Sequence, residues 1–176
     1  MVVIELTLRA ATNRDKEAVT ELVLSVLGEY RLAPDPAGTD ADLRDLERSY
    51  AGGAFDVLVD ANGILVGCVG LRALDATTCE LRKMYLQKHV RGQGLGRRLL
   101  EHALDRAKSL GFERVTLETA SVLTDAIRLY TSYGFRPYPT EHLSCRCDRA
   151  YMLDLRLTRP QKRERDAGPS DPRTRI

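Results

Sequence analysis

The sequence contains no tryptophan, and aromatic residues make up only 6% of its 176 residues. It has no apolar run of about 20 residues, the length that a membrane-spanning helix needs. Its first residues have neither the basic stretch nor the apolar core of a signal peptide. Neither sign of charge dominates, because 27 Lys and Arg residues stand against 25 Asp and Glu residues. We therefore expect a cytoplasmic globular protein that binds neither membranes nor nucleic acid.

Cysteine is also scarce. The four cysteines are Cys68, Cys79, Cys145 and Cys147. Only one residue separates Cys145 from Cys147, and a second pair of ligands with zinc-site spacing is missing. We expect reduced, structural thiols and no metal site.

The composition changes near residue 158. From there to residue 176, six Lys and Arg residues stand against three Asp and Glu residues, with almost no apolar side chain. Such a segment buries too little apolar surface to offset the entropy of ordering. We predict one domain over residues 1–157 and a disordered charged tail over residues 158–176. The remaining body has a net charge close to −1, so the pI of about 8.4 says little about the folded surface.

Apolar periodicity divides the domain into strands and helices. An Asn-Gly turn joins residues 55–59 and 64–71 into an antiparallel hairpin, which residues 80–86 extend to a meander. Residues 114–119 return after a helix and are expected to run parallel to residues 80–86. Strands are predicted at residues 6–10, 55–59, 64–71, 80–86, 114–119, 135–138 and 150–157, and helices at 13–30, 40–50, 97–110 and 125–133.

Local signals refine two of the helices. Thr12 or Asn13 is the expected N-cap of the first helix, with Glu17 as its capping partner. In the helix from Arg97, apolar residues at helical spacing, ending with Leu110, are expected to cover the sheet.

A glycine-rich turn links the strand at residues 80–86 to the helix that follows from Arg97. Gly92, Gly94 and Gly96 occupy every second position of the turn. They leave backbone N–H groups uncovered beside the positive end of a helix, an arrangement that binds phosphate. The spacing is not the G-x-G-x-x-G of a dinucleotide fold, and a P-loop's Lys-Ser/Thr does not follow Gly96. Neither of these two phosphate motifs fits.

The turn matches the signature Arg/Gln-x-x-Gly-x-Gly/Ala, which Arg91, Gly94 and Gly96 fill. Three further segments occur in matching order: Glu-Leu-Arg-Lys-Met-Tyr-Leu before the turn, Val-Thr-Leu-Glu-Thr after the helix, and Leu-Tyr followed by Gly-Phe downstream. In these features most of residues 6–157 resembles the GNAT superfamily of N-acetyltransferases.

This resemblance implies an α/β (α+β) fold with a mixed, mainly antiparallel central sheet and helices on both faces. It also implies a splayed parallel strand pair, where acetyl-coenzyme A (acetyl-CoA) binds. The pyrophosphate is expected on the backbone amides of the glycine-rich turn, and the pantetheine arm on the main chain of the preceding strand. The side chains of that strand are expected to pack in the core. The implied cofactor-binding residues are Met84, Leu86, Arg91, Gly92, Gln93, Gly94, Leu95, Gly96 and Arg97.

The resemblance also suggests a catalytic acid. Tyr130 matches the family's tyrosine, and its phenol can donate a proton to a thiolate leaving group. The alternative is a half-buried tyrosine that packs on the sheet. At one position the sequence departs from the family, because Leu123 stands where many members carry an asparagine that contacts the pantetheine arm.

The resemblance also makes Glu80 the candidate base, because several GNAT enzymes carry a glutamate at the start of this strand that removes a proton from the amine. A carboxylate beside an apolar pocket would have a raised pKa. The alternative is a surface glutamate paired with Arg82 or Arg72. Glu118 is a second candidate base, and His142 a third.

We therefore expect direct transfer of an acetyl group from acetyl-CoA to a primary amine of a small molecule or amino acid, in a ternary complex and without a metal. A homodimer is possible. The alternatives are acetylation of protein N-termini or lysines, and an acyl-CoA sensor without catalytic activity.

Overall fold

The computed structural model describes residues 5–157, and the predicted tail lies outside them. Seven strands, four α-helices and three short 3-10 turns (η) alternate along these residues. In chain order the elements are β1 (Leu6–Ala10), η1 (Asn13–Asp15), α1 (Lys16–Glu29), η2 (Ala41–Arg44), α2 (Leu46–Ser49), β2 (Ala54–Asp60), β3 (Leu65–Ala73), β4 (Thr78–Leu86), η3 (Lys88–Val90), α3 (Leu95–Ser109), β5 (Arg114–Thr119), α4 (Thr124–Ser132), β6 (Arg136–Pro137) and β7 (Arg149–Asp154).

All seven strands form one sheet in the order β1-β2-β3-β4-β5-β7-β6. Every neighbouring pair is antiparallel except β4 and β5, which run parallel because α3 crosses over between them. The predicted mixed, mainly antiparallel sheet is confirmed. The strand β7 lies between β5 and β6, so the last strand of the described chain is not at the edge of the sheet.

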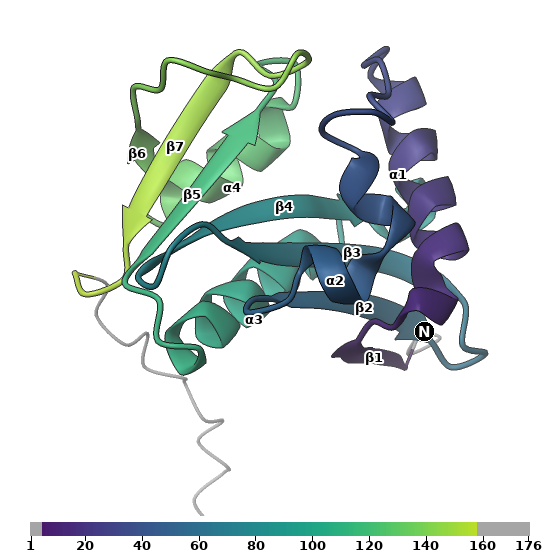
Figure 1. Cartoon of the computed structure of the whole chain (residues 1–176). Helices are drawn as coiled ribbons and strands as arrows, with labels where there is room; N and C mark the ends of the chain where they lie inside the picture. The colour runs from purple at the N-terminus through teal and green to yellow at the C-terminus, as the bar shows by residue number, and fades with distance from the viewer. Residues whose placement is uncertain (1–4, 158–176) are drawn as a thin grey trace, which may run out of the picture.

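The parallel pair of strands separates after a short contact. Pairing runs only from Thr78 opposite Arg114 to Glu80 opposite Thr116. Beyond Glu80 the two strands diverge, and β5, β7 and β6 turn away from the rest of the sheet (Figure 1). This fork is the splayed pair that the resemblance implied.

A β-bulge in β4 accompanies the fork. Cys68 of β3 pairs with Tyr85 and Gly70 with Arg82, so two residues of β4 oppose the single residue between them on β3. The extra residue is Lys83, which has a φ of 52°, an unusual value for a residue other than glycine. Because the bulge interrupts the alternation of faces, the neighbouring side chains of Arg82 and Lys83 reach the same carbonyl oxygen, that of Thr39.

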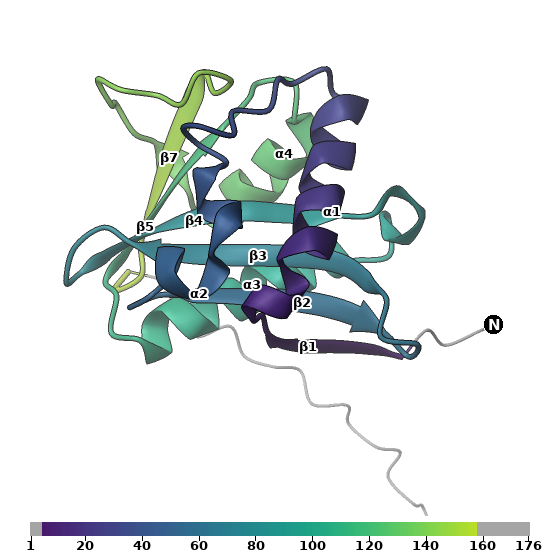
Figure 2. The same cartoon turned by 45° about the vertical axis from the view of Figure 1, so that its right-hand side comes forward.

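Helices cover both faces of the sheet, as the resemblance implied. Figure 2 shows α1 and α2 over one face of β2, β3 and β4, with α3 and α4 behind the sheet. Each face has its own core of buried apolar side chains. On the first face α1 buries Val19, Leu22, Val23, Val26 and Leu27, and on the second α3 buries Leu95, Leu99, Leu100, Ala103, Leu104 and Ala107.

Some local expectations were wrong. Thr12 caps η1 rather than α1, and its capping partner is Asp15, not Glu17, because a 3-10 turn precedes the helix. The helix predicted at residues 40–50 is divided into η2 and α2 by the extended backbone of Asp45. Leu110 is 42% exposed, since the helix has already ended at Ser109.

Candidate functional site

A cavity of about 430 Å³ begins where β4 and β5 separate. Strand β4 forms one wall, the end of β5 and helix α4 form another, and the start of α3 closes one end. The segments before η2 and before β7 complete its opposite end with Thr39, Ser144, Arg146 and Cys147. The cavity therefore has glycines of the turn at one end and polar and charged side chains at the other.

Glu80 stands at the branch of the fork. It is the last residue of β4 that pairs with β5, and it lines the cavity. Its side chain is 17% exposed and lies 3.6 Å from Arg82 Nη1, too far for a hydrogen bond. Burial raises the pKa of Glu80, and the nearby Glu118 adds to the rise while Arg82 opposes it. Glu80 is thus a mostly buried carboxylate that forms an ion pair with Arg82 without a hydrogen bond, and not a solvated surface residue.

Tyr130 lines the same cavity from helix α4. Its ring lies 5.7 Å from that of Phe135, which fixes its place in the core. The residue is 7% exposed, and none of the hydrogen bonds between described residues involves its hydroxyl group. Burial raises the pKa of Tyr130 well above its ordinary value, so the phenol keeps its proton at neutral pH.

The glycine-rich turn lies at the N-terminus of α3. Gly92 and Gly94 have φ values of 76° and 78°, a conformation that other residues rarely adopt. Nothing lies within 4 Å of the positions where their Cβ atoms would stand, so the backbone is open on that side. Gly94 is the N-cap of α3 and makes no side-chain cap, which leaves the first N–H groups of the helix for an anion.

Arg91 has a different role from the rest of the turn. Its guanidinium group bonds both carboxylate oxygens of Glu29, at 2.7 and 3.0 Å. It also donates two hydrogen bonds to the carbonyl oxygen of Leu86, at 2.8 and 2.9 Å. The side chain thus ties α1, β4 and the turn together. Because that carbonyl is fully engaged, a ligand contact at Leu86 is expected on its N–H group.

The structure brings most of the predicted residues together. Seven of them line the cavity, namely Glu80, Met84, Leu86, Arg91, Gly92, Gly96 and Tyr130. Four others, Gln93, Gly94, Leu95 and Arg97, belong to the turn or the start of α3 but do not line it. The side chain of Leu95 is buried in the core, which leaves only its backbone for a ligand. The cofactor role of these residues stays a prediction.

The comparisons with known proteins agree with this geometry. The model of the acetyltransferase (GNAT) family matches residues 20–135. The chain belongs to the GNAT family. The Escherichia coli K12 protein YjgM, described as an uncharacterized N-acetyltransferase, is 35% identical over 150 residues, which cover 78% of this chain and 89% of the relative.

Solved structures share the fold. A GNAT acetyltransferase of Staphylococcus aureus superposes with a TM-score of 0.79 at 25% identity, covering 86% of this chain and 99% of the other. A phosphinothricin acetyltransferase of Sinorhizobium meliloti, solved in complex with acetyl-CoA, has a TM-score of 0.65 at 23% identity, covering 85% and 88%. The fold and the relatives together identify this GNAT protein as an acyltransferase.

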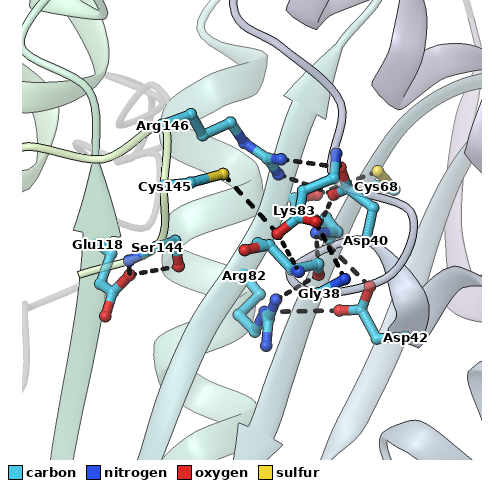
Figure 3. Close-up of polar contacts among 12 residues, drawn as sticks. Gly38, Asp40, Asp42, Cys68, Arg82, Lys83, Glu118, Ser144, Cys145 and Arg146 are labelled. Atoms are coloured by element: carbon cyan, nitrogen blue, oxygen red, sulfur yellow. Dashed lines mark hydrogen bonds and ion pairs between the residues drawn. The ribbon is translucent and has the colours of Figure 1, made fainter. Parts of the chain in front are cut away.

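Sequence reasoning missed a buried ionic cluster at one end of the GNAT cavity (Figure 3). Asp40, whose side chain is 4% exposed, lies 2.7 Å from Lys83 Nζ and accepts two hydrogen bonds from Arg146, both of 2.7 Å. Burial raises the pKa of Asp40, but the hydrogen bonds from Arg146, the Asp35 N–H and Lys83 outweigh it and hold the pKa well below its usual range. The cluster joins three segments that are distant in sequence.

The carboxylate of Glu118, the second candidate base, already accepts hydrogen bonds. Oε2 of Glu118 accepts hydrogen bonds from the N–H of Ser144 at 2.9 Å and from its hydroxyl at 2.6 Å. Glu118 lines the cavity, whereas His142 is exposed and does not. Of the alternative bases, Glu118 is in place but held by Ser144, and His142 lies away from the cavity.

Two properties of residues 5–157 bear on the remaining expectations. None of the helices in this range is long and apolar enough to span a membrane. Within the same range the acidic, cysteine and histidine side chains form no group that could hold a metal ion.

Proposed function

We propose that the protein transfers an acetyl group from acetyl-CoA directly to the primary amine of a small molecule. The observation that carries the proposal is that Glu80 and Tyr130, a carboxylate and a phenol, line one cavity at the fork between β4 and β5. Direct transfer needs a base for the amine and an acid for the leaving sulfur on the two sides of one reaction centre. The cavity offers both.

The residues present fit acetyl-CoA. The open backbone at Gly92 and Gly94 would hold the pyrophosphate against the N-terminus of α3. The unpaired edge of β4 beyond Glu80 would pair with the amide groups of the pantetheine arm, as an added strand does. The structure of the Sinorhizobium meliloti relative contains acetyl-CoA, which supports this assignment. When bound, acetyl-CoA supplies a thioester whose carbonyl carbon bonds the amine nitrogen as the C–S bond breaks.

Glu80 removes the proton that the amine nitrogen loses. An amine is mostly protonated at neutral pH and attacks only as the free base, so a group must accept its proton. The raised pKa of Glu80 makes its carboxylate a stronger base than a solvated glutamate. Its position at the branch of the fork places it beside the edge of β4 that the pantetheine arm would occupy.

Tyr130 protonates the departing sulfur. Because burial raises its pKa, the phenol holds its proton until negative charge develops beside it. The protonated amine loses two protons in becoming an amide; one matches the proton that the sulfur gains and the other is released through Glu80, so the products are an N-acetyl amine, free coenzyme A and one proton.

The thiol in the cavity does not favour an acetyl-cysteine intermediate. Cys147 lines the cavity, and burial raises its pKa to about 11. A cysteine attacks as the thiolate, of which little exists at neutral pH with such a pKa. This supports direct transfer in a ternary complex.

The test is release of coenzyme A thiol from acetyl-CoA over a panel of primary amines, with mass spectrometry of the products. Acetylation of small amines is expected, with no turnover of peptides or proteins at comparable rates. Preferred acetylation of peptide N-termini or lysines would replace the small-molecule acceptor with a protein. Binding of acetyl-CoA without turnover of any amine would instead indicate a sensor.

A further inference from the structure

Two arginine side chains line the end of the cavity where the ionic cluster lies. Arg82 comes from β4 and Arg146 from the segment before β7, and their side chains are 10% and 7% exposed. Figure 3 shows Arg146 beside Asp40 and Arg82 beside Asp42. Buried guanidinium groups need acceptors for their N–H groups, so the partners of these two arginines indicate what a ligand finds there.

Neither arginine has a hydrogen-bond acceptor for each of its N–H groups. A guanidinium group carries five N–H bonds. Among the described residues Arg82 makes one hydrogen bond, from Nη2 to the carbonyl of Thr39 at 2.6 Å, and its Nε lies 3.4 Å from Asp42. Arg146 uses one N–H on each terminal nitrogen, both for Asp40. The remaining N–H groups have no hydrogen-bond acceptor within residues 5–157, although both side chains border the cavity.

The charges of the cluster depend on the protonation of Glu80. Three cations, Arg82, Lys83 and Arg146, face three carboxylates, those of Asp40, Asp42 and Glu80, the last of which lies 3.6 Å from Arg82 without a hydrogen bond. When Glu80 takes the proton of the amine, as proposed above, it becomes neutral and one positive charge remains in excess. A carboxylate of the ligand would balance that charge and accept hydrogen bonds from the unfilled guanidinium donors.

The spacing of Glu80 and Arg82 limits how the two ends of such a ligand are arranged. The residues are two apart on β4, so their side chains share a face of the sheet. The carboxylate of Glu80 and the guanidinium of Arg82 lie 3.6 Å apart. A ligand that gives its amine to the first and a carboxylate to the second must carry the two groups close together, as an α-amino acid does.

We propose that the acceptor is an α-amino acid whose amine meets Glu80 and whose carboxylate is bound by Arg82, with Arg146 beside it. This inference rests on the proposed acetyl transfer and specifies its acceptor. Such a site would prefer free amino acids to peptide N-termini and simple amines, because the latter two have no carboxylate next to the amine.

The test uses matched acceptors and the wild-type enzyme. Several L-amino acids are each compared with their carboxamide and with the amine that lacks the carboxyl group, at fixed acetyl-CoA and with thiol release as the readout. We expect kcat/KM for the free acid to exceed that for both analogues by roughly ten- to a hundredfold, the usual effect of a hydrogen-bonded charge pair. Equal or faster acetylation of the carboxamides or simple amines would overturn the inference while leaving the proposed function intact.

A variant locates the contact. Arg82→Gln also changes the surroundings of Glu80 for every acceptor, so the two substrates are compared with each other: kcat/KM for the free acid should fall by at least about tenfold more than kcat/KM for the carboxamide. An equal loss with both substrates would mean that Arg82 does not bind the carboxylate and would overturn its assignment. If the variant is poorly folded, the wild-type comparison decides. If no amine of either kind is acetylated while acetyl-CoA still binds, the proposed function fails, and the inference fails with it.

Discussion

At the scale of single residues, the chemistry depends on what burial does to two side chains. Glu80 and Tyr130 both have raised pKa values, mainly because the cavity removes them from water. Burial makes the carboxylate a better base and keeps the phenol protonated. The same physical effect therefore prepares one residue to accept a proton and the other to hold one, without a charged partner in hydrogen-bond contact with either.

The role of Glu80 has a pH signature. Its carboxylate acts as base only when ionised, so kcat/KM should rise with pH through a pKa above the ordinary value for glutamate. Glu80→Gln should lower kcat/KM by about 10²-fold or more and remove this limb of the pH profile. The measurement is kcat/KM against pH for both proteins. A variant that retains the limb would transfer the role to Glu118 or water.

Tyr130 is tested by removing one oxygen atom. Tyr130→Phe keeps the ring that packs on Phe135 and should leave folding intact. We expect kcat to fall by about 10²-fold, with little change in the Kd of acetyl-CoA, because the hydroxyl acts on the leaving sulfur. Steady-state kinetics and calorimetric binding separate the two. Unchanged turnover would assign the proton to water.

Sequence motifs located residues of the cavity, but they missed residues that only the folded chain brings together. Glu80 and Tyr130, whose catalytic roles stay predictions, line the cavity and were named because they stand in fixed order around the glycine-rich turn. Asp40 and Arg146 were not found, since they are 106 residues apart and only the folded chain brings them together. Aspartate is seldom buried, and nothing in the sequence around Asp40 marks it as an exception.

At the scale of elements, the site depends on two departures from regular structure in adjacent parts of the chain. The bulge at Lys83 turns two cations toward one side of β4, and the glycine-rich turn begins α3 without a side-chain cap. The turn was predicted because glycine at φ near 80° leaves a sequence signal. The bulge was not, because Lys83 adopts a positive φ without being glycine.

The turn is tested by a pair of matched glycines. Gly94 has a φ of 78° and Gly63, in the turn between β2 and β3, has 79°, and nothing lies within 4 Å of either Cβ position. Valine at either site should cause similar backbone strain. We expect Gly94→Val to weaken acetyl-CoA binding at least about tenfold and Gly63→Val to leave it unchanged. Calorimetry measures both, and equal affinities would remove the turn from the cofactor site.

At the scale of the whole molecule, the ionic cluster joins parts of the chain that the sheet does not connect. Asp40 belongs to the segment between α1 and α2, Lys83 to β4, and Arg146 to the segment before β7. The fork separates β5, β7 and β6 from the other strands beyond Glu80. The carboxylate of Asp40 thus links β4 and the segment before β7, which lie on the two sides of the cavity, to the segment between α1 and α2.

The ion pairs of Asp40 predict that the stability of the fold depends on pH. The pKa of Asp40 is lowered in the folded protein, so its stabilising contribution is complete above the unfolded pKa of about 3.9 and is lost as the pH falls below it. Asp40→Asn leaves Arg146 buried without its carboxylate and leaves Lys83 with only Asp42, at 3.5 Å. It should lower the free energy of unfolding by about 3–5 kcal/mol at pH 7. Urea denaturation at several pH values measures the difference from the wild type, which should shrink at low pH.

The matched control is Asp154→Asn. Asp154 pairs with Arg156 at 2.6 Å, but the arginine side chain is 62% exposed. Solvent screens such a pair, so its loss should change the free energy of unfolding much less than the loss of the Asp40 carboxylate does. Equal effects of the two substitutions would mean that the Asp40 cluster stabilises the fold no more than a surface pair does. A large effect confined to Asp40 would identify it as the residue that holds the two arms of the fork around the cavity.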